Sequence, residues 1–355
     1  MNTDGTTPSE FARDTRSTDL TPMLRVLLEG RTLTVEETTT AFEAMMTGEV
    51  HHGEMGAFLA LLATRLPTPE ELEGAAHVMR RHVTGIQSTV PPDRILDTAG
   101  TGGAPKTFNV STAAALVAAG AGAVVAKHGN RSRTGRGSAE ALQSVGINVD
   151  ADTDTQARCL EEAGICFCFA IHHHPATRHV MPVRKAMGVP TIFNLLGPLT
   201  NPAGAGRQLM GVWDGMYQQP VAEALDRLGT TRALVVHSDD GLDELSISAP
   251  STVVEVHNGS VSTWRVNPED VGLKTSDISA VTARDLEHAT AMMQAVLDGS
   301  EQGPPRDMTL LNAAAALLAC DLVSNLEEGV QVAATAIDQG QAMEALARLS
   351  RVSNS

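Results

Sequence analysis

Residues 20–90 carry the apolar spacing of helices together with clear helix start signals. Thr34 is followed three residues later by Glu37, and Thr68 is followed in the same way by Glu71. This is the spacing of a capping box, in which hydroxyl and carboxylate oxygens satisfy the free amides of a helix start. The pattern therefore predicts a small helical domain.

Beyond residue 91 the pattern changes to short apolar runs that alternate with alanine-rich stretches. Such alternation predicts an α/β fold, with a larger domain built on a mainly parallel central sheet whose faces carry helices. Expected strands are 95–100, 123–129, 165–171 and 233–238; expected helices are 111–122, 138–146, about 176–188 and three more between 283 and 350; a hairpin over 253–266 turns at Asn258-Gly259.

Composition narrows the classes of protein that remain. The 355 residues carry a formal net charge of -16, which disfavours nucleic acid and anionic membrane surfaces as partners. Four cysteines without regular spacing argue against a disulfide framework, and residues 1–19 lack a secretory signal and are expected to be disordered. No apolar run reaches the roughly 18 residues of a membrane span. We therefore expect a cytoplasmic protein.

The first candidate for chemistry is the glycine-rich segment 97–112, DTAGTGGAPKTFNVST, which lies between an expected strand and helix. Ligands of α/β sheets bind at the carboxyl ends of strands, where free amides and hydroxyls can cradle an anion. The segment matches neither the P-loop nor the dinucleotide-binding spacing, so a plain tight turn is the alternative.

A second loop, KHGNRSRTGRGS (127–138), is strongly basic. From Thr98 to Ala139 the chain has no acid and five Lys or Arg residues, a local charge of +5 within a chain of -16. A solvated basic face is one interpretation. Together with the glycine-rich turn, an anion site is the better one, and Gly, Asn, Ser and Arg suit phosphate oxygens.

The loop HSDDGLDELS (237–246) gathers Asp239, Asp240, Asp243 and Glu244 after another strand. Mg²⁺ is usually held by one or two carboxylates together with water and substrate phosphates. Alone, the loop is better explained as a solvated acidic turn. Opposite a phosphate cradle, it indicates a magnesium site.

The segment 171–202 contains His172 to His174 and follows Cys166 and Cys168. Because the cysteines alternate with phenylalanines, we interpret this strand as buried rather than as part of a metal cluster. Arg184, further along, is either a surface charge or the receptor of a substrate carboxylate.

Six motifs occur in order: GTGG (100–103), FNVSTAAALVAAGAG (108–122), KHGNRS (127–132), TIFNLLGPLTNP (191–202), DGLDE (240–244) and LLNAAAALL (310–318). Together they resemble the anthranilate phosphoribosyltransferase family from about Leu20 to Arg351. The resemblance implies Mg²⁺-assisted transfer of the phosphoribosyl group from phosphoribosyl pyrophosphate (PRPP) to anthranilate in tryptophan biosynthesis. No covalent nucleophile is implied. It also implies a nucleoside phosphorylase-like fold and a homodimer.

The resemblance implies roles for named residues. PRPP would be bound by Gly100, Gly103, Thr107, Asn109, Ser111, Thr112, Lys127, Asn130, Arg131, Ser132 and Ser138. Mg²⁺ would be bound by Ser111, Asp243 and Glu244, and anthranilate by Gly100, Asn130 and Arg184, with His128, Gly197 and Pro198 nearby. Residues 176–205 would rejoin the helical domain, which leaves 91–175 and 206–352 as the α/β domain.

The sequence departs from the family pattern at several positions. Ala104 replaces an acid, the two phosphate loops are each one residue shorter, and Arg133 and Arg136 stand in a loop that is usually serine-rich. The channel for the acceptor also differs, at Ile171, His173 and Thr177.

Other functions fit parts of this pattern. A pyrimidine nucleoside phosphorylase, or another phosphoribosyltransferase of the same fold, would share the glycine-rich turn and the basic loop, and dependence on inorganic phosphate would reveal the former. A non-catalytic paralogue that binds PRPP is the alternative outside enzymes. The presence of Lys127, Asp243 and Glu244 argues against lost catalysis, and Ala104 argues for it.

Overall fold

The computed structural model describes residues 18–103, 107–132 and 135–355. The segment expected to be disordered, 1–19, therefore lies outside the described residues except for Thr18 and Asp19. The backbone amide of Thr18 donates to the carbonyl of Glu49 at 2.7 Å. None of the helices in the described part is long and apolar enough to cross a membrane.

The helical elements run in the following order. They are α1 (Thr21–Leu28), α2 (Val35–Thr47), α3 (His52–Ala63), α4 (Pro69–Arg81), α5 (Val110–Gly120), α6 (Ser138–Ser144), α7 (Thr153–Arg158), α8 (Ala170–His173), α9 (Met181–Met187), α10 (Phe193–Leu196), α11 (Gln218–Arg227), α12 (Leu286–Leu297), α13 (Pro304–Ala319), α14 (Leu326–Asp338) and α15 (Gln341–Ser353). Short 3₁₀ turns are Pro92–Arg94, Pro175–His179, Gly215–Tyr217, Pro268–Val271 and Ile278–Val281, and Cys159–Ala163 is a π-helical turn.

The strands are β1 (Ile95–Asp97), β2 (Val124–Gly129), β3 (Ile165–Phe169), β4 (Arg207–Gly211), β5 (Arg232–Ser238), β6 (Ser251–His257) and β7 (Ser260–Val266). Within the described chain they form a seven-stranded sheet in the order β3-β2-β1-β4-β5-β6-β7. The first five strands in this order, β3, β2, β1, β4 and β5, pair with their neighbours in parallel. Strand β6 is antiparallel to β5, and β7 is antiparallel to β6. The predicted mainly parallel sheet is thus confirmed, as is the hairpin.

Local sequence explains two of these features. Both predicted capping boxes form, with Thr34 accepting from the amide of Glu37 and Thr68 from that of Glu71. In the hairpin, Asn258 and Gly259 have φ of 53° and 71°, the left-handed pair that a tight turn between twisted strands requires.

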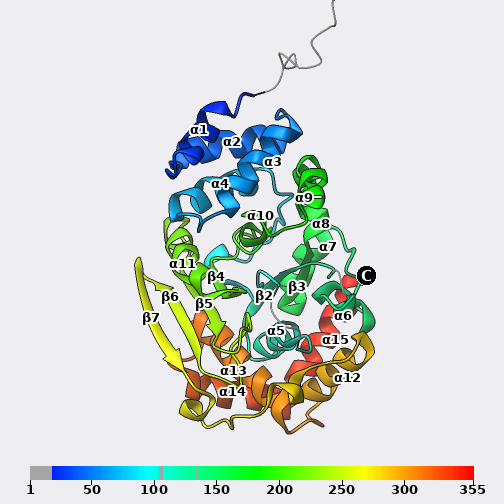
Figure 1. Cartoon of the computed structure of the whole chain (residues 1–355). Coiled ribbons are helices and arrows are strands. Elements are labelled where there is room, and N and C mark those ends of the chain that lie inside the picture. Colours follow the sequence, from blue (N-terminus) through cyan, green and yellow to red (C-terminus); the bar gives the residue numbers. More distant parts are fainter. Residues whose placement is uncertain (1–17, 104–106, 133–134) are drawn as a thin grey trace, which may run out of the picture.

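One face of the sheet is covered by α5 and by α12 to α15 (Figure 1). Helix α5 lies at the centre of this core, and its run of alanines lets neighbouring helices approach closely. At Gly120 a Cβ atom would lie only 2.8 Å from the backbone of Ala342, so α15 could not pack there against any larger residue. The richness in alanine and glycine therefore serves tight packing.

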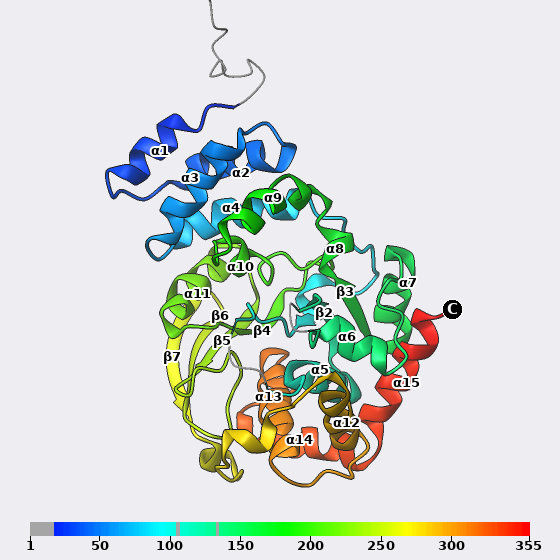
Figure 2. The same cartoon turned by 45° about the vertical axis from the view of Figure 1, so that its right-hand side comes forward.

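The other face of the sheet shares a core with α1 to α4. Helices α9 and α10, from residues 181–196, lie beside α3 and α4 (Figure 2). The rings of Phe42 and Phe193 stand 5.3 Å apart, which joins α2 to α10. Apolar side chains continue from these helices onto β4 and β5, so the division of the chain at residue 90 stays a prediction.

The sequence-based assignment was wrong or incomplete in several places. Residues 283–350, all of them described, belong to four helices rather than three, because Gly340, with φ of 77°, separates α14 from α15. The helix expected over 176–188 is instead a 3₁₀ turn followed by the short α9. Strand β4 and helices α7, α8, α10 and α11 were not predicted. The strands expected over 95–100 and 165–171 end at Asp97 and Phe169, and α8 begins directly after the second of them.

Candidate active site

A cleft of about 700 Å³ opens where the parallel strands end. It is lined by every residue that the sequence predicted for a site: Gly100, Gly103, Thr107, Asn109, Ser111, Thr112, Lys127, Asn130, Arg131, Ser132, Ser138, Arg184, Asp243 and Glu244. His128 lines the cleft too, whereas Gly197 and Pro198 do not. The structure thus brings the four candidate loops together, while the role of each residue stays a prediction.

The glycine-rich segment forms one wall and leads into the start of α5. Gly103 has φ of 99°, a conformation that favours glycine. A Cβ atom at Gly100 would lie 3.1 Å from a carboxylate oxygen of Asp243, so the absent side chain lets the acidic turn approach. The chain then enters α5 at Val110, and Ser111 and Thr112 lie in its first turn. Ala104, a departure from the family pattern, lies outside the described residues.

Lys127, on β2, is buried in the wall of the cleft. Its Nζ donates to the carbonyl and hydroxyl oxygens of Thr98, each at 3.2 Å, and to Ser111 Oγ at 3.3 Å. Burial lowers the pKa of Lys127 to about 8, and the negative charges of Asp97 and Glu244 oppose that shift. The ammonium group is therefore available as a cation for an anionic ligand at neutral pH.

Asp243 and Glu244 face this lysine from the turn after β5. Glu244 accepts from Thr107 Oγ1 at 3.1 Å and from the amide of Ser111 at 3.2 Å. Burial, and then the adjacent Asp243, raise the pKa of Glu244 well above its usual range. A divalent cation would relieve the repulsion between the two carboxylates, and hard oxygen donors are those that Mg²⁺ prefers.

The carboxylates of Asp243 and Glu244 could hold Mg²⁺ only together with further ligands. In the part of the chain that the structure describes, no three His, Cys, Asp or Glu side chains converge as a metal centre. The Ser111 hydroxyl, water and ligand oxygens would have to complete the coordination shell.

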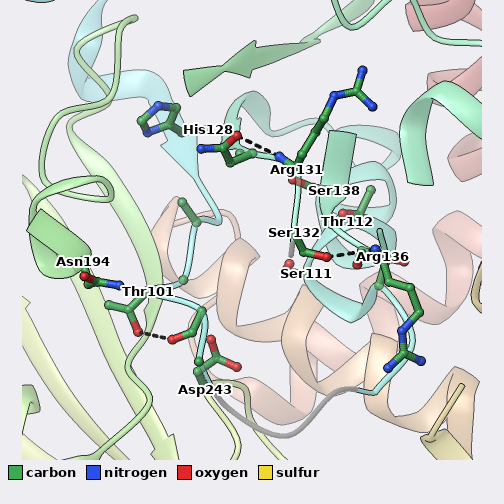
Figure 3. A pocket seen from close by; sticks show the side chains of 18 of the residues that line it. Thr101, Ser111, Thr112, His128, Arg131, Ser132, Arg136, Ser138, Asn194 and Asp243 are labelled. Atoms are coloured by element: carbon green, nitrogen blue, oxygen red, sulfur yellow. Dashed lines mark hydrogen bonds between the residues drawn. The ribbon is translucent and has the colours of Figure 1, made fainter. Parts of the chain in front are cut away.

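The arginines of the basic loop are engaged by the protein itself. Arg131 lies over the ring of Phe169, 5.5 Å from its centroid, and Arg136 donates from Nη1 to the carbonyl of Ala283. Both side chains extend away from Ser111 and Asp243 (Figure 3). Arg133 lies outside the described residues. In this conformation Lys127 is thus the buried cation that faces the acids.

The opposite part of the cleft has a different chemistry. Arg184, on α9, lies over the ring of Phe193 at 5.1 Å and donates to Asn194 Oδ1 at 3.4 Å. Met181, Val189 and Pro190 add apolar surface nearby. A guanidinium on an apolar wall suits a flat ligand that carries a carboxylate.

His128 connects these two parts. Its Nδ1 lies 3.1 Å from the carbonyl of Gly197, which can only accept, so Nδ1 carries the proton. Its Nε2 lies 3.3 Å from Nε2 of His174, which must then be the donor. Burial, and then His174, lower the pKa of His128 to about 3, so the ring is neutral at physiological pH.

Sequence reasoning missed three buried polar residues at this site. Asp97 is the last residue of β1 and accepts from the amide of His128 at 3.0 Å. His174 and Asn312 were noticed within motifs and given no role. An acid that ends an apolar strand was the available signal for Asp97, because a buried carboxylate needs a reason to be there.

An anion cradle at the strand ends, beside a buried acid pair and under a helical part, is the arrangement of a transferase that handles a phosphorylated sugar. Profiles of the glycosyl transferase family agree with this class: its helical bundle domain matches residues 21–83, and its a/b domain matches residues 92–343. The chain belongs to the anthranilate phosphoribosyltransferase family.

That membership rests on relatives that match nearly the whole chain. The anthranilate phosphoribosyltransferase of Symbiobacterium thermophilum is 48% identical over 92% of this chain and 96% of its own length. The anthranilate phosphoribosyltransferase of Chloroflexus aggregans is 45% identical over 91% of this chain and 95% of its own length.

Solved structures agree with this assignment. The anthranilate phosphoribosyltransferase of Thermus thermophilus is 39% identical, with a TM-score of 0.88 over 94% of this chain and 99% of its own. The Saccharomyces cerevisiae enzyme in complex with PRPP and Mg is 26% identical, with a TM-score of 0.84 over 94% and 98%. That yeast enzyme has also been solved with 4-fluoroanthranilate.

Proposed function

We propose that this chain is an anthranilate phosphoribosyltransferase. It transfers the phosphoribosyl group of PRPP to the amine of anthranilate and releases N-(5-phosphoribosyl)anthranilate and pyrophosphate, a step of tryptophan biosynthesis. The observation that carries the proposal is the division of one cleft into a cationic, glycine-rich side with a buried acid pair and an arginine-bearing apolar side. PRPP and anthranilate require these two chemistries side by side.

The glycine-rich segment, the start of α5 and the basic loop form the PRPP side. Backbone amides, hydroxyls and the Lys127 ammonium would bind the phosphate oxygens. We assign this role to Gly100, Gly103, Thr107, Asn109, Ser111, Thr112, Lys127, Asn130, Arg131, Ser132 and Ser138. Arg131 would leave the ring of Phe169 to do so, since it rests there in this conformation.

We assign the Mg²⁺ site to Asp243, Glu244 and Ser111. Bound there, the ion would neutralise charge that develops on the departing pyrophosphate. The protein would hold both carboxylates ionised and in place, although burial alone favours a proton on Glu244. Deprotonation of Glu244 would therefore accompany loading of the site.

The acceptor side would bind anthranilate through Arg184, Asn130 and Gly100. The aromatic amine is neutral at pH 7 and can attack the sugar carbon without prior deprotonation, so no strong base is needed. His128 fits this view, because both of its ring nitrogens are engaged. Catalysis would rest on positioning and on stabilisation of the leaving group.

The test is a fluorescence assay of anthranilate consumption by the purified protein. We expect consumption only when PRPP and Mg²⁺ are both present, and loss of turnover in excess chelator. Unchanged turnover in chelator would refute the metal assignment. Activity on a nucleoside that depends on inorganic phosphate would instead favour a nucleoside phosphorylase, and PRPP binding without turnover would favour a non-catalytic paralogue.

Assembly and location form part of the same proposal. We propose a homodimer formed through the helical domain, which residues 176–205 rejoin, and a cytoplasmic enzyme. Packing of α9 and α10 against α3 and α4 supports the rejoining. The four cysteines are all free, which is compatible with a reducing compartment. Mass measurement in solution at micromolar concentration tests the dimer.

A further inference from the structure

The turn that carries Asp243 and Glu244 is held by a buried side chain that also lines the cleft. Asn312, on α13, is only 2% exposed. Its Oδ1 accepts from the backbone amide of Leu245 at 3.0 Å, and its Nδ2 donates to the carbonyl of Leu245 at 2.8 Å. Leu245 directly follows Glu244. The amide group thus pairs with both backbone groups of the residue next to the acids.

Asn312 is itself held in place. Its second Nδ2 hydrogen goes to the carbonyl of Met308 at 2.9 Å, so both donors and the acceptor of the amide are used. Residues 308–319 of α13 are buried along the whole helix. The side chain is therefore a rigid point of attachment rather than a mobile contact.

The remainder of the turn has little freedom to adjust. Ser238 donates from its amide to the carbonyl of Leu242 at 3.0 Å, and Ser246 Oγ donates to a carboxylate oxygen of Asp240 at 2.6 Å. The carbonyl of Asp243 lies so near Gly211 that a Cβ atom there would come within 1.6 Å of it. Because the turn is fixed at these other points, a shift of Leu245 would be transmitted to Glu244.

We infer that Asn312 is a positioning residue for the divalent-cation site: by pairing with Leu245 it sets the direction of the Asp243 and Glu244 carboxylates toward Ser111. The inference rests on the proposed function, since it concerns the same site. It assigns a role to the motif LLNAAAALL (310–318), which the binding assignments leave unexplained. Groups behind the ligands of a metal commonly change its affinity 10- to 100-fold when removed, by the order of magnitude known for such partners.

The experiment measures binding of Mn²⁺, used as a paramagnetic substitute for Mg²⁺, by electron paramagnetic resonance at saturating PRPP. Asn312→Leu removes both hydrogen bonds to Leu245 with little change in shape. Thr309→Val is the matched control: Thr309 is buried on the same helix, and its hydroxyl donates within the helix to Pro305. Anthranilate KM is measured in parallel.

For Asn312→Leu we expect Mn²⁺ to bind about tenfold more weakly or worse, with the KM for anthranilate within about twofold of the wild type. Thr309→Val should leave both values within about twofold. A purely structural role would instead weaken Mn²⁺ and anthranilate equally, or neither, and either result overturns the inference. If the wild type itself binds no Mn²⁺ with PRPP present, the proposed function is refuted.

A second variant covers the case in which Asn312→Leu does not fold. Asn312→Asp has the same shape and keeps an acceptor for the amide of Leu245, but it loses the donor to Leu245 and Met308. We expect it to weaken Mn²⁺ binding at least threefold while the circular dichroism spectrum stays that of the wild type. Wild-type Mn²⁺ affinity in a folded Asn312→Asp protein overturns the inference.

Discussion

Asp97 allows a direct test of how buried charge is used at the cleft. The side chain is 0% exposed, and its Oδ2 finds no hydrogen-bond partner among the described residues. Burial raises the pKa of Asp97 to about 6 from the ordinary 3.8. Above pH 6 the folded protein thus holds a carboxylate that would be better solvated in the unfolded chain. Asp97→Asn removes this charge and keeps an oxygen for the amide of His128.

The size and the sign of the effect follow from proton linkage. Because folding raises the pKa of Asp97, the stability from this group is fully present below pH 3.8 and is lost as pH rises through 6. The difference between the two pKa values, 3.8 and about 6, corresponds to about 3 kcal/mol in the free energy of unfolding, and about half of this is already lost by pH 5. Between pH 5 and pH 8 the free energy of unfolding of the variant should therefore rise by about 1.4 kcal/mol relative to that of the wild type.

The assay is urea denaturation of both proteins at pH 5 and pH 8, without Mg²⁺ or PRPP. Titrating groups that do not interact with Asp97 cancel in the difference between the free energies of unfolding of the two proteins, and the lower pKa of Lys127 in the variant adds to the expected gain toward pH 8. Asp152→Asn is a control whose difference from the wild type should be the same at pH 5 and pH 8, because hydrogen bonds from Thr155 lower the pKa of Asp152 below 3.8 and its contribution is lost only at more acidic pH. A difference for Asp97→Asn that is the same at both pH values would refute the reasoning.

The same substitution should affect ligand binding. The negative charge of Asp97 supports the protonated form of Lys127, so its removal lowers the pKa of that lysine below about 8. The PRPP affinity of Asp97→Asn relative to the wild type, measured by calorimetry in chelator, should therefore fall between pH 6.5 and pH 8.5. A rising ratio would show that the two charges are not coupled.

Three further predictions concern other parts of the molecule. Asp243→Asn combined with Glu244→Gln should lower kcat at least 100-fold with the fold retained. Wild-type turnover would instead support the interpretation of this segment as a solvated acidic turn. Arg184→Ala should raise the KM for anthranilate about 30-fold or more, since truncating one partner of a sequestered charge pair costs about 2–5 kcal/mol, while equal damage to PRPP binding would contradict the assignment. Glu71→Gln should destabilise the protein by about 3 kcal/mol in urea denaturation, because buried Glu71 pairs with Arg65 at 2.5 Å and 2.8 Å, and an unchanged midpoint would refute this.

The cleft was predictable because of a rule of topology. Parallel strands end at one edge of a sheet, so the loops after β1, β2 and β5 had to meet, although they are separated by up to about 140 residues. Each loop alone was compatible with an ordinary turn. Their shared location made a phosphate cradle beside an acid pair the better interpretation, and every residue to which the resemblance assigned binding of PRPP, Mg²⁺ or anthranilate lines one cleft.

Elements whose pattern is set by tertiary contacts were not predictable in this way. Strand β4, RQLMG, is short and begins with polar residues whose side chains bond to distant segments: Arg207 to Asp321, and Gln208 to Pro198. The break between α14 and α15 was also not predicted, because Gly340 lies in a continuous alanine-rich stretch. Sequence spacing does not show such long-range partners.

Charge counting was also a limited guide to the site. The excess of +5 over 98–139 pointed to an anion site, but Arg131 and Arg136 contact Phe169 and Ala283 in this conformation. The cleft is distinguished by ionisable groups that are removed from water. Asp97, Lys127 and Glu244 are buried, and burial raises the pKa of the two acids and lowers that of the lysine, which favours the neutral form of each. A lysine between two acids leaves a net negative charge when all three are ionised. A divalent cation bound beside Glu244 would offset this negative charge.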